Sequence, residues 1–336
     1  MPPTRILLIR TVMAGLTVGL LFVGVFLAAM HDPRPHRLPV TLVGTEPQVA
    51  GIRAGISRAT GDAFDVRITP DRAAAVDSLR HRDTFAVYEP AARVVTVAGA
   101  NGPAVTQTVT GLFGAVAGAG AAGALRVDDA VPLPRDDSRG LSTFYVAFGA
   151  VLAGFLTAVA GAALPVTVRP RQRYAALAGF AVVLAAGITL LADPVVGALP
   201  GAPVELLVVT ALLAAAVATT GTAIIQLLGP AAGTGVASLL LLILGNATSG
   251  ATLPASYLPA LLRPLHDVLP VGVAVDAIIG AVHFADAGLV KALLVLTGWA
   301  LLGAAGIARA HRRAQSDGPA GPGPTVAAPV TAYRAP

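Results

Sequence analysis

The chain has 336 residues, of which 55% are hydrophobic and only 12% are charged, whereas an average soluble domain has about 25% charged residues, so a water-soluble fold of this size is excluded. The formal charge of +5 comes from short arginine clusters beside apolar runs, which favours membrane topology and argues against a nucleic-acid partner. Cysteine is absent, which excludes disulfides, thiolate metal sites and cysteine nucleophiles.

The first predicted membrane span covers residues 11–30, after a cytoplasmic N-terminus of residues 1–10. These twenty residues carry no charge and are long enough to cross about 30 Å of hydrocarbon as a helix. A cleaved signal peptide is the alternative, because Arg5, Arg10 and the Leu-Ala-Ala end at 27–29 are compatible with one. The apolar stretch exceeds the usual core of a signal peptide, so we expect a retained span.

Residues 31–140 have the pattern of a small extracytoplasmic α/β domain with a linker. Their charge is balanced, with twelve arginines and twelve acidic residues. Alternating and capped segments predict strands at 38–43, 64–69, 85–88 and 94–97, and helices at 47–59 and, after the cap Asp71, up to residue 80. We further expect a long Ala/Gly-rich helix over 102–125 that leads back to the membrane, followed by a polar linker over 126–140.

The transmembrane domain is predicted over residues 141–309, with five further spans and therefore six in all. These spans are expected at 141–168, 174–192, 206–228, about 230–246 and 288–307. Threading them from a cytoplasmic N-terminus places the arginine clusters inside, which predicts a multi-pass plasma-membrane protein with both termini cytoplasmic. Residues 310–336 are rich in proline, glycine and alanine and predict a disordered cytoplasmic tail.

The segment 246–284, between the fifth and sixth spans, is apolar but broken by four prolines, so it cannot be one spanning helix. We expect short re-entrant helices that enter the bilayer from outside and line or gate a pathway. Asp276 is the first choice for a functional polar group, because a charge inside an apolar run is costly; capping of a re-entrant helix is the alternative. The candidate gate or pathway residues are Asn246, Ser249, Gly250, Pro254, Pro259, His266, Pro270 and Asp276.

A family resemblance rests on this segment and on the order of the elements. The run Asn-x-x-Ser-Gly from Asn246, Leu-His-x-x-Leu-Pro up to Pro270 and Ala-Val-Asp up to Asp276 resembles permeases of the type-2 ABC exporters, in particular their YhgE/Pip-like branch. The resemblance implies a permease half that forms a homodimer or heterodimer, re-entrant helices that close the outer end of an export path, and a separate ATP-binding subunit. It also implies, by position, that Arg169, Arg171 and Arg173 contact that subunit.

No catalytic site or cofactor is expected in the chain itself. A phosphate-binding loop needs a lysine after glycines, and the only lysine, Lys291, lacks that context, so ATP hydrolysis requires the separate subunit. The histidines of the extracytoplasmic domain lack metal-ligand spacing. The resemblance therefore implies a permease that works in export, and we expect its substrate to be amphipathic. The alternative is a non-transporting envelope receptor or scaffold that works through its extracytoplasmic domain.

Overall fold

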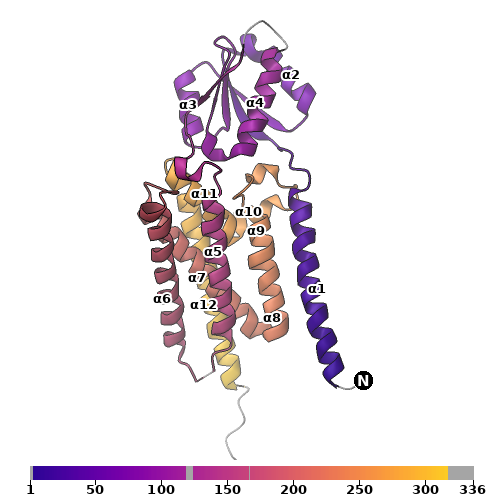
Figure 1. The fold of residues 1–336 in the computed structure, drawn as a ribbon, viewed down its shortest axis with the longest axis vertical. Helices are drawn as coiled ribbons and strands as arrows, with labels where there is room; N and C mark the ends of the chain where they lie inside the picture. The colour runs from indigo at the N-terminus through magenta and orange to yellow at the C-terminus, as the bar shows by residue number, and fades with distance from the viewer. Residues whose placement is uncertain (1–2, 119–123, 166, 317–336) are drawn as a thin grey trace, which may run out of the picture.

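The computed structural model of the chain describes residues 3–118, 124–165 and 167–316. They form two stacked parts, a small α/β domain and a bundle of long helices (Figure 1). The first helix, α1 (Pro3–Met30), stands at one side of the bundle and leads into the α/β domain. Helix α1 therefore begins at the end of the bundle that is far from this domain.

The α/β domain contains one five-stranded sheet with the strand order β2-β1-β3-β4-β5. Strand β1 is parallel to β2 and β3, the β3–β4 pair is an antiparallel hairpin, and β5 is parallel to β4. The predicted α/β domain and its first four strands are thereby confirmed. The strands are β1 (Leu38–Val43), β2 (Phe64–Thr69), β3 (Ala86–Glu89), β4 (Val94–Val97) and β5 (Arg126–Asp129).

Three helices cover this sheet, and the alternation of strand side chains assigns them to its two faces. On β3, Tyr88 belongs to a core shared with α2 (Glu46–Thr60) and α4 (Pro103–Gly118) and stacks on Phe113 with ring centroids 4.8 Å apart. The adjacent Val87 belongs instead to the core shared with α3 (Arg72–Arg80). The predicted cap of α3 is present, because the Asp71 carboxylate accepts hydrogen bonds from two backbone N–H groups of its first turn.

A helix is present within the predicted stretch 102–125, but the predictions that it leads to the membrane and that a linker begins at 126 are wrong. Helix α4 ends at Gly118 and packs on the sheet, because Val105, Val109 and Phe113 recur every four residues on one buried face. Residues 119–123 lie outside the described residues. Strand β5 then forms the sheet edge; its charged, mostly exposed residues have no apolar alternation by which a strand is recognised.

Five helical segments of the described residues are long and apolar enough to cross a membrane, which confirms a polytopic helical protein. The predicted first span lies in α1, whose apolar part within these residues is Gly15–Met30. The five segments are α5 (Ser142–Ala162), α6 (Pro170–Leu190) with η3 (Leu191–Val195), α7 (Pro203–Leu228), α8 (Pro230–Ala237) with η4 (Ser238–Leu244) and α9 (Gly245–Ala247), and α12 (Leu289–Ser316).

The last helix corrects the predicted tail over 310–336. Helix α12 continues to Ser316, so residues 310–316 are helical, and residues 317–336 lie outside the described residues. Basic residues in the final turns of a helix interact favourably with its negative C-terminal end, which is why the cluster Arg309, Arg312 and Arg313 extends the helix.

Helix α7 is the central helix of the bundle. Within its apolar window 72% of the residues are buried, against 39% or less in the other four segments. It packs closely on α12 at Gly303, where an added Cβ would lie 2.5 Å from the Thr219 hydroxyl oxygen and 2.5 Å from the Thr220 nitrogen. The Thr220 hydroxyl donates a hydrogen bond to the Trp299 carbonyl at 3.1 Å, so small and hydroxyl residues bring the two backbones together.

This contact predicts a specific cost for enlarging Gly303. We expect Gly303→Ala to destabilise the purified protein in detergent by about 1–3 kcal/mol, because the methyl group overlaps the α7 backbone. Gly298→Ala on the same helix is the matched control, since an added Cβ there meets no atom within 4 Å. Unfolding followed by circular dichroism measures both; equal midpoints for the two variants would contradict the close packing.

Candidate functional site at the domain junction

The broken segment, residues 246–284, forms short helices at the end of the bundle next to the α/β domain (Figure 1). It contains η5 (Ala255–Tyr257), α10 (Arg263–Val268) and α11 (Pro270–His283), so the prediction that it is not one continuous helix is confirmed. Proline fixes φ and lacks an N–H, and it accordingly precedes η5 as Pro254 and starts α11 as Pro270.

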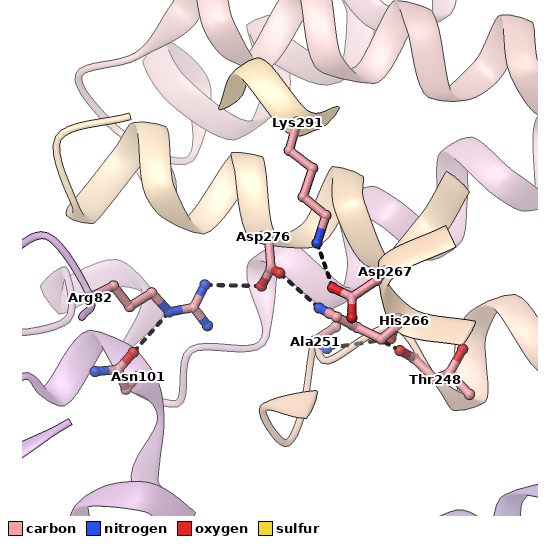
Figure 2. Close-up of polar contacts among 9 residues, drawn as sticks. Arg82, Asn101, Thr248, Ala251, His266, Asp267, Asp276 and Lys291 are labelled. Atoms are coloured by element: carbon pink, nitrogen blue, oxygen red, sulfur yellow. Dashed lines mark hydrogen bonds and ion pairs between the residues drawn. The ribbon is translucent and has the colours of Figure 1, made fainter. Parts of the chain in front are cut away.

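Asp276 is the centre of the polar contacts at this junction (Figure 2). Its Oδ2 lies 2.7 Å from Nε2 of His266 on α10, and its Oδ1 accepts a hydrogen bond from Nη1 of Arg82 at 3.0 Å. The side chains of His266 and Arg82 are only 4% and 13% exposed, and that of Asp276 is 31% exposed. A carboxylate on an otherwise apolar helix is thus paired with two basic side chains from two different parts of the molecule.

Arg82 comes from the α/β domain, and the end of α3 determines its position. The Arg82 N–H donates to the Leu79 carbonyl and the Asp83 N–H to the Ser78 carbonyl, which is the Schellman pattern of helix ends. Arg82 itself has φ +64°, a left-handed conformation in which glycine is usual. An arginine in this conformation has a strained backbone, and the strain occurs at the residue whose side chain reaches the broken segment.

Two further contacts fix the Arg82 guanidinium. Its Nε donates a hydrogen bond to Asn101 Oδ1 at 3.1 Å, as Figure 2 shows, and its Cζ lies 5.7 Å from the centre of the Phe284 ring. Such charge-assisted and cation–π contacts hold a guanidinium in one orientation. The position of the Arg82 side chain therefore does not depend on Asp276 alone.

His266 is almost completely buried. Its Nδ1 lies 3.0 Å from the Thr248 carbonyl oxygen, and two glycines make room for it: an added Cβ would lie 2.8 Å from its ring at Gly250 and 2.2 Å from its carbonyl at Gly272. Burial lowers the pKa of His266, but the hydrogen bond and charge of Asp276 and the Thr248 carbonyl outweigh burial. The pKa of His266 is therefore raised above its ordinary value.

Helix α10 is also attached to α12. Lys291 Nζ pairs with the Asp267 carboxylate, although both side chains are about half exposed, and the Trp299 indole N–H donates to the Val268 carbonyl at 2.8 Å. The two residues that follow His266 are thus connected to the last long helix, and Trp299 lies next to the short helix that carries His266.

A second attachment between the broken segment and the α/β domain is apolar. Tyr257 of η5 is 4% exposed and packs in the core of the α/β domain. Next to it, the His36 N–H donates to the Ser256 carbonyl at 2.8 Å. The broken segment is therefore held to this domain at two places, by an inserted aromatic ring and by an ion pair.

A cavity of about 320 Å³ lies beside the ion pair and opens to the surface at the junction. Arg82 and Phe85 of the α/β domain line one side, and Pro254, His266 and Asp276 of the broken segment line the other. Among the described residues no group of three His, Cys, Asp or Glu side chains could hold a metal ion. Arg82 and His266 thus share one carboxylate beside an open cavity.

The predicted gate residues divide between this site and its supporting turn. Four of them, Gly250, Pro254, His266 and Asp276, lie together at the cavity or against the His266 ring. Asn246 and Ser249 are buried in the preceding turn, where the Asn246 amide donates to the Leu242 carbonyl and the Ser249 hydroxyl accepts from the Ala251 N–H. Pro259 lies away from the cavity in the loop after η5, and Pro270 starts α11.

The three predicted docking arginines differ in their surroundings. Arg169 and Arg171 are exposed at the end of the bundle far from the α/β domain. Arg173 is 4% exposed and donates to the Gly161, Leu164 and Pro165 carbonyls at and just after the end of α5. Arg173 therefore caps a helix, and of the three only Arg169 and Arg171 are exposed.

Sequence reasoning did not identify Arg82 or Tyr257. Tyr257 reads as one more apolar residue of the broken segment, and Arg82 is one of twelve arginines in a charge-balanced region. The one available signal was local: an arginine directly after a predicted helix end, where glycine is preferred. Comparison of the chain with protein-family models, with curated proteins and with solved structures finds no match.

Neutralising Asp276 and neutralising Asp267 are expected to lower the stability of the protein by different amounts. We expect Asp276→Asn to lower the free energy of unfolding by about 2–3 kcal/mol, because Arg82 and His266 both lose a charged acceptor in a mostly buried site. Asp267→Asn, which breaks only the exposed pair with Lys291, is expected to cost less than about 1 kcal/mol. Thermal unfolding of both variants in the same detergent measures the difference, and a smaller loss for Asp276→Asn would refute this account of the site.

Proposed function

We propose that this chain is the permease subunit of an ABC-type exporter, which moves an amphipathic substrate out of the cytoplasm with a second permease half and a separate ATP-binding subunit. The observation that carries the proposal is the direct tie between an α/β domain and a broken helical segment just before the last span, through Arg82 and Asp276. A segment that is broken, buried and held to a separate domain by a pair of charges has properties expected of a gate at one end of a transport path.

The charge distribution supports one orientation. Arg169 and Arg171 lie at the end of the bundle far from the α/β domain. The last turns of α12 lie at the same end, since Arg173 and His311 line one cavity of about 490 Å³ there. By the positive-inside rule this end is cytoplasmic and the α/β domain lies outside the plasma membrane. Helix α1 is then the first span, which together with the five long segments makes six.

Two exposed arginines at the proposed cytoplasmic end of the bundle could bind an ATP-binding subunit. Arg169 and Arg171 begin α6, are exposed and make no ion pair among the described residues. Free guanidinium groups at a helix–helix turn can pair with carboxylates of a docked subunit. ATP binding there would shift the bundle between inward-facing and outward-facing states.

The test is recovery of an ATPase with the purified protein. We expect gentle solubilisation of native membranes to yield a complex that hydrolyses ATP, and the Arg169→Glu, Arg171→Glu double variant to recover about tenfold less of it, which is about 1.4 kcal/mol of docking free energy. The matched control reverses the charges of Arg53 and Arg58, which are exposed on α2 in the α/β domain. Arg173 stays unchanged, because its replacement would disturb the fold.

The alternative function has a distinct outcome. If no ATPase is recovered while envelope proteins remain bound, and if that binding depends on the α/β domain, the chain is a receptor or scaffold. An ATPase recovered equally well with both double variants would retain the exporter but move the docking surface away from Arg169 and Arg171.

A further inference from the structure

The contacts of His266 specify the protonation state of its ring. Nδ1 faces the Thr248 carbonyl oxygen and Nε2 faces the Asp276 carboxylate, at 3.0 Å and 2.7 Å. Carbonyl and carboxylate oxygens only accept hydrogen bonds, so each ring nitrogen must donate. A neutral imidazole carries one N–H, and both bonds are therefore made only by the protonated ring.

We propose that His266 is a proton-binding residue that controls how tightly the α/β domain is attached to the broken segment. The protonated ring holds the Asp276 carboxylate where Arg82 reaches it. After loss of the proton the ring has a single N–H, so it loses either the bond to Thr248 or the bond to Asp276, and in both cases the positive charge that attracted the carboxylate is gone. The carboxylate then leaves its position, and the pair with Arg82, the ionic attachment of the α/β domain, weakens.

The α/β domain is expected to loosen and not to separate from the broken segment, because Tyr257 forms a second attachment between them. The second attachment is made by the Tyr257 ring and by the backbone N–H of His36 and the carbonyl of Ser256, and these groups do not titrate near neutral pH, so we expect it to persist from pH 5 to pH 9. The α/β domain is then expected to pivot about Tyr257 when the ionic attachment opens. The cavity of about 320 Å³ beside Asp276 gives the side chains room to rearrange.

The charged neighbours of His266 come from four elements. Asp276 and Arg82 form the pair described, and Asp267 on α10 is itself paired with Lys291 of α12. Two other histidines are close, and they are the necessary controls because histidine titrates near neutral pH. Further titratable and charged groups of the described residues around the site are His81 at the end of α3, which lines the same cavity, and Arg263 of α10, which donates to the Leu258 carbonyl. His283 of α11 lines a second cavity together with Arg82, Asp137 and Arg139.

The direction of the pH effect follows from the raised pKa of His266. A basic group whose pKa is higher in the attached state contributes its full stabilisation below its ordinary pKa of about 6.5 and loses it as the pH rises through the higher value. Between the two values the equilibrium constant for opening rises about tenfold per pH unit. The attachment is thus tight in mildly acidic medium and loose in alkaline medium.

The single tryptophan of the chain reports on this change. Trp299 donates its indole N–H to the carbonyl of Val268, two residues after His266. We expect its fluorescence, measured from pH 5 to pH 9 on the full chain in detergent without any ATPase, to show one transition with a midpoint above pH 6.5. His266→Gln should abolish the transition, whereas His81→Gln and His283→Gln should retain it. A transition that survives in His266→Gln would overturn the proposal.

A second measurement keeps His266 in place and does not depend on that variant folding. The chain has no cysteine, so spin labels can be placed at Arg80→Cys on α3 and Val290→Cys on α12, both of which are exposed. We expect a narrow distance distribution at pH 6 and a broader one at pH 9. An unchanged distribution would overturn the proposal. The result is independent of whether the chain transports, since no partner or nucleotide is present.

Discussion

One carboxylate, that of Asp276, determines how the two parts of this protein fit together. An ionised carboxylate on an apolar helix is costly to bury unless cations and hydrogen-bond donors satisfy it. His266 satisfies one oxygen from within the broken segment, but the other oxygen is satisfied by Arg82, which belongs to a different domain. The Asp276 charge can therefore be buried only while the α/β domain stays next to the bundle, and the pair with Arg82 in turn favours that placement of the domain.

The junction combines two interactions with different physical character. The Tyr257 ring in the α/β core contributes apolar burial, which is large, non-directional and insensitive to protons. The Arg82–Asp276–His266 contacts are directional and depend on the charge of every member. Their combination gives a joint that stays assembled while one of its contacts changes. Under the proposed topology this joint lies on the outer side of the membrane, where an arriving proton reaches it without crossing the bilayer.

The sequence predicted the elements whose determinants are local. The Asp71 cap and the alternation over 64–69 each specify a structure within a few residues, and both elements have the predicted type and position. Strand β5 was missed because a charged edge strand is stabilised by its neighbour and not by its own pattern. The pairing of Arg82 with Asp276 could not be predicted, because the two residues are 194 positions apart and no local rule selects one arginine among twelve. Asp276 itself was recognisable, since a lone charge in an apolar run is conspicuous whatever its partner.

The bundle and the junction also differ in how much they can change shape. Around α7, contacts such as Gly303 against Thr219 bring backbones so close that any displacement creates overlap or an empty space, and both are unfavourable. At the junction, a cavity adjoins a pair of charges whose attraction changes with one proton. A conformational change begins where contacts can be broken at the lowest cost in free energy. We therefore expect motion of this protein to begin at the junction. The close packing of α7 and α12 then carries that motion along the bundle as a rigid unit toward the end where the arginines lie.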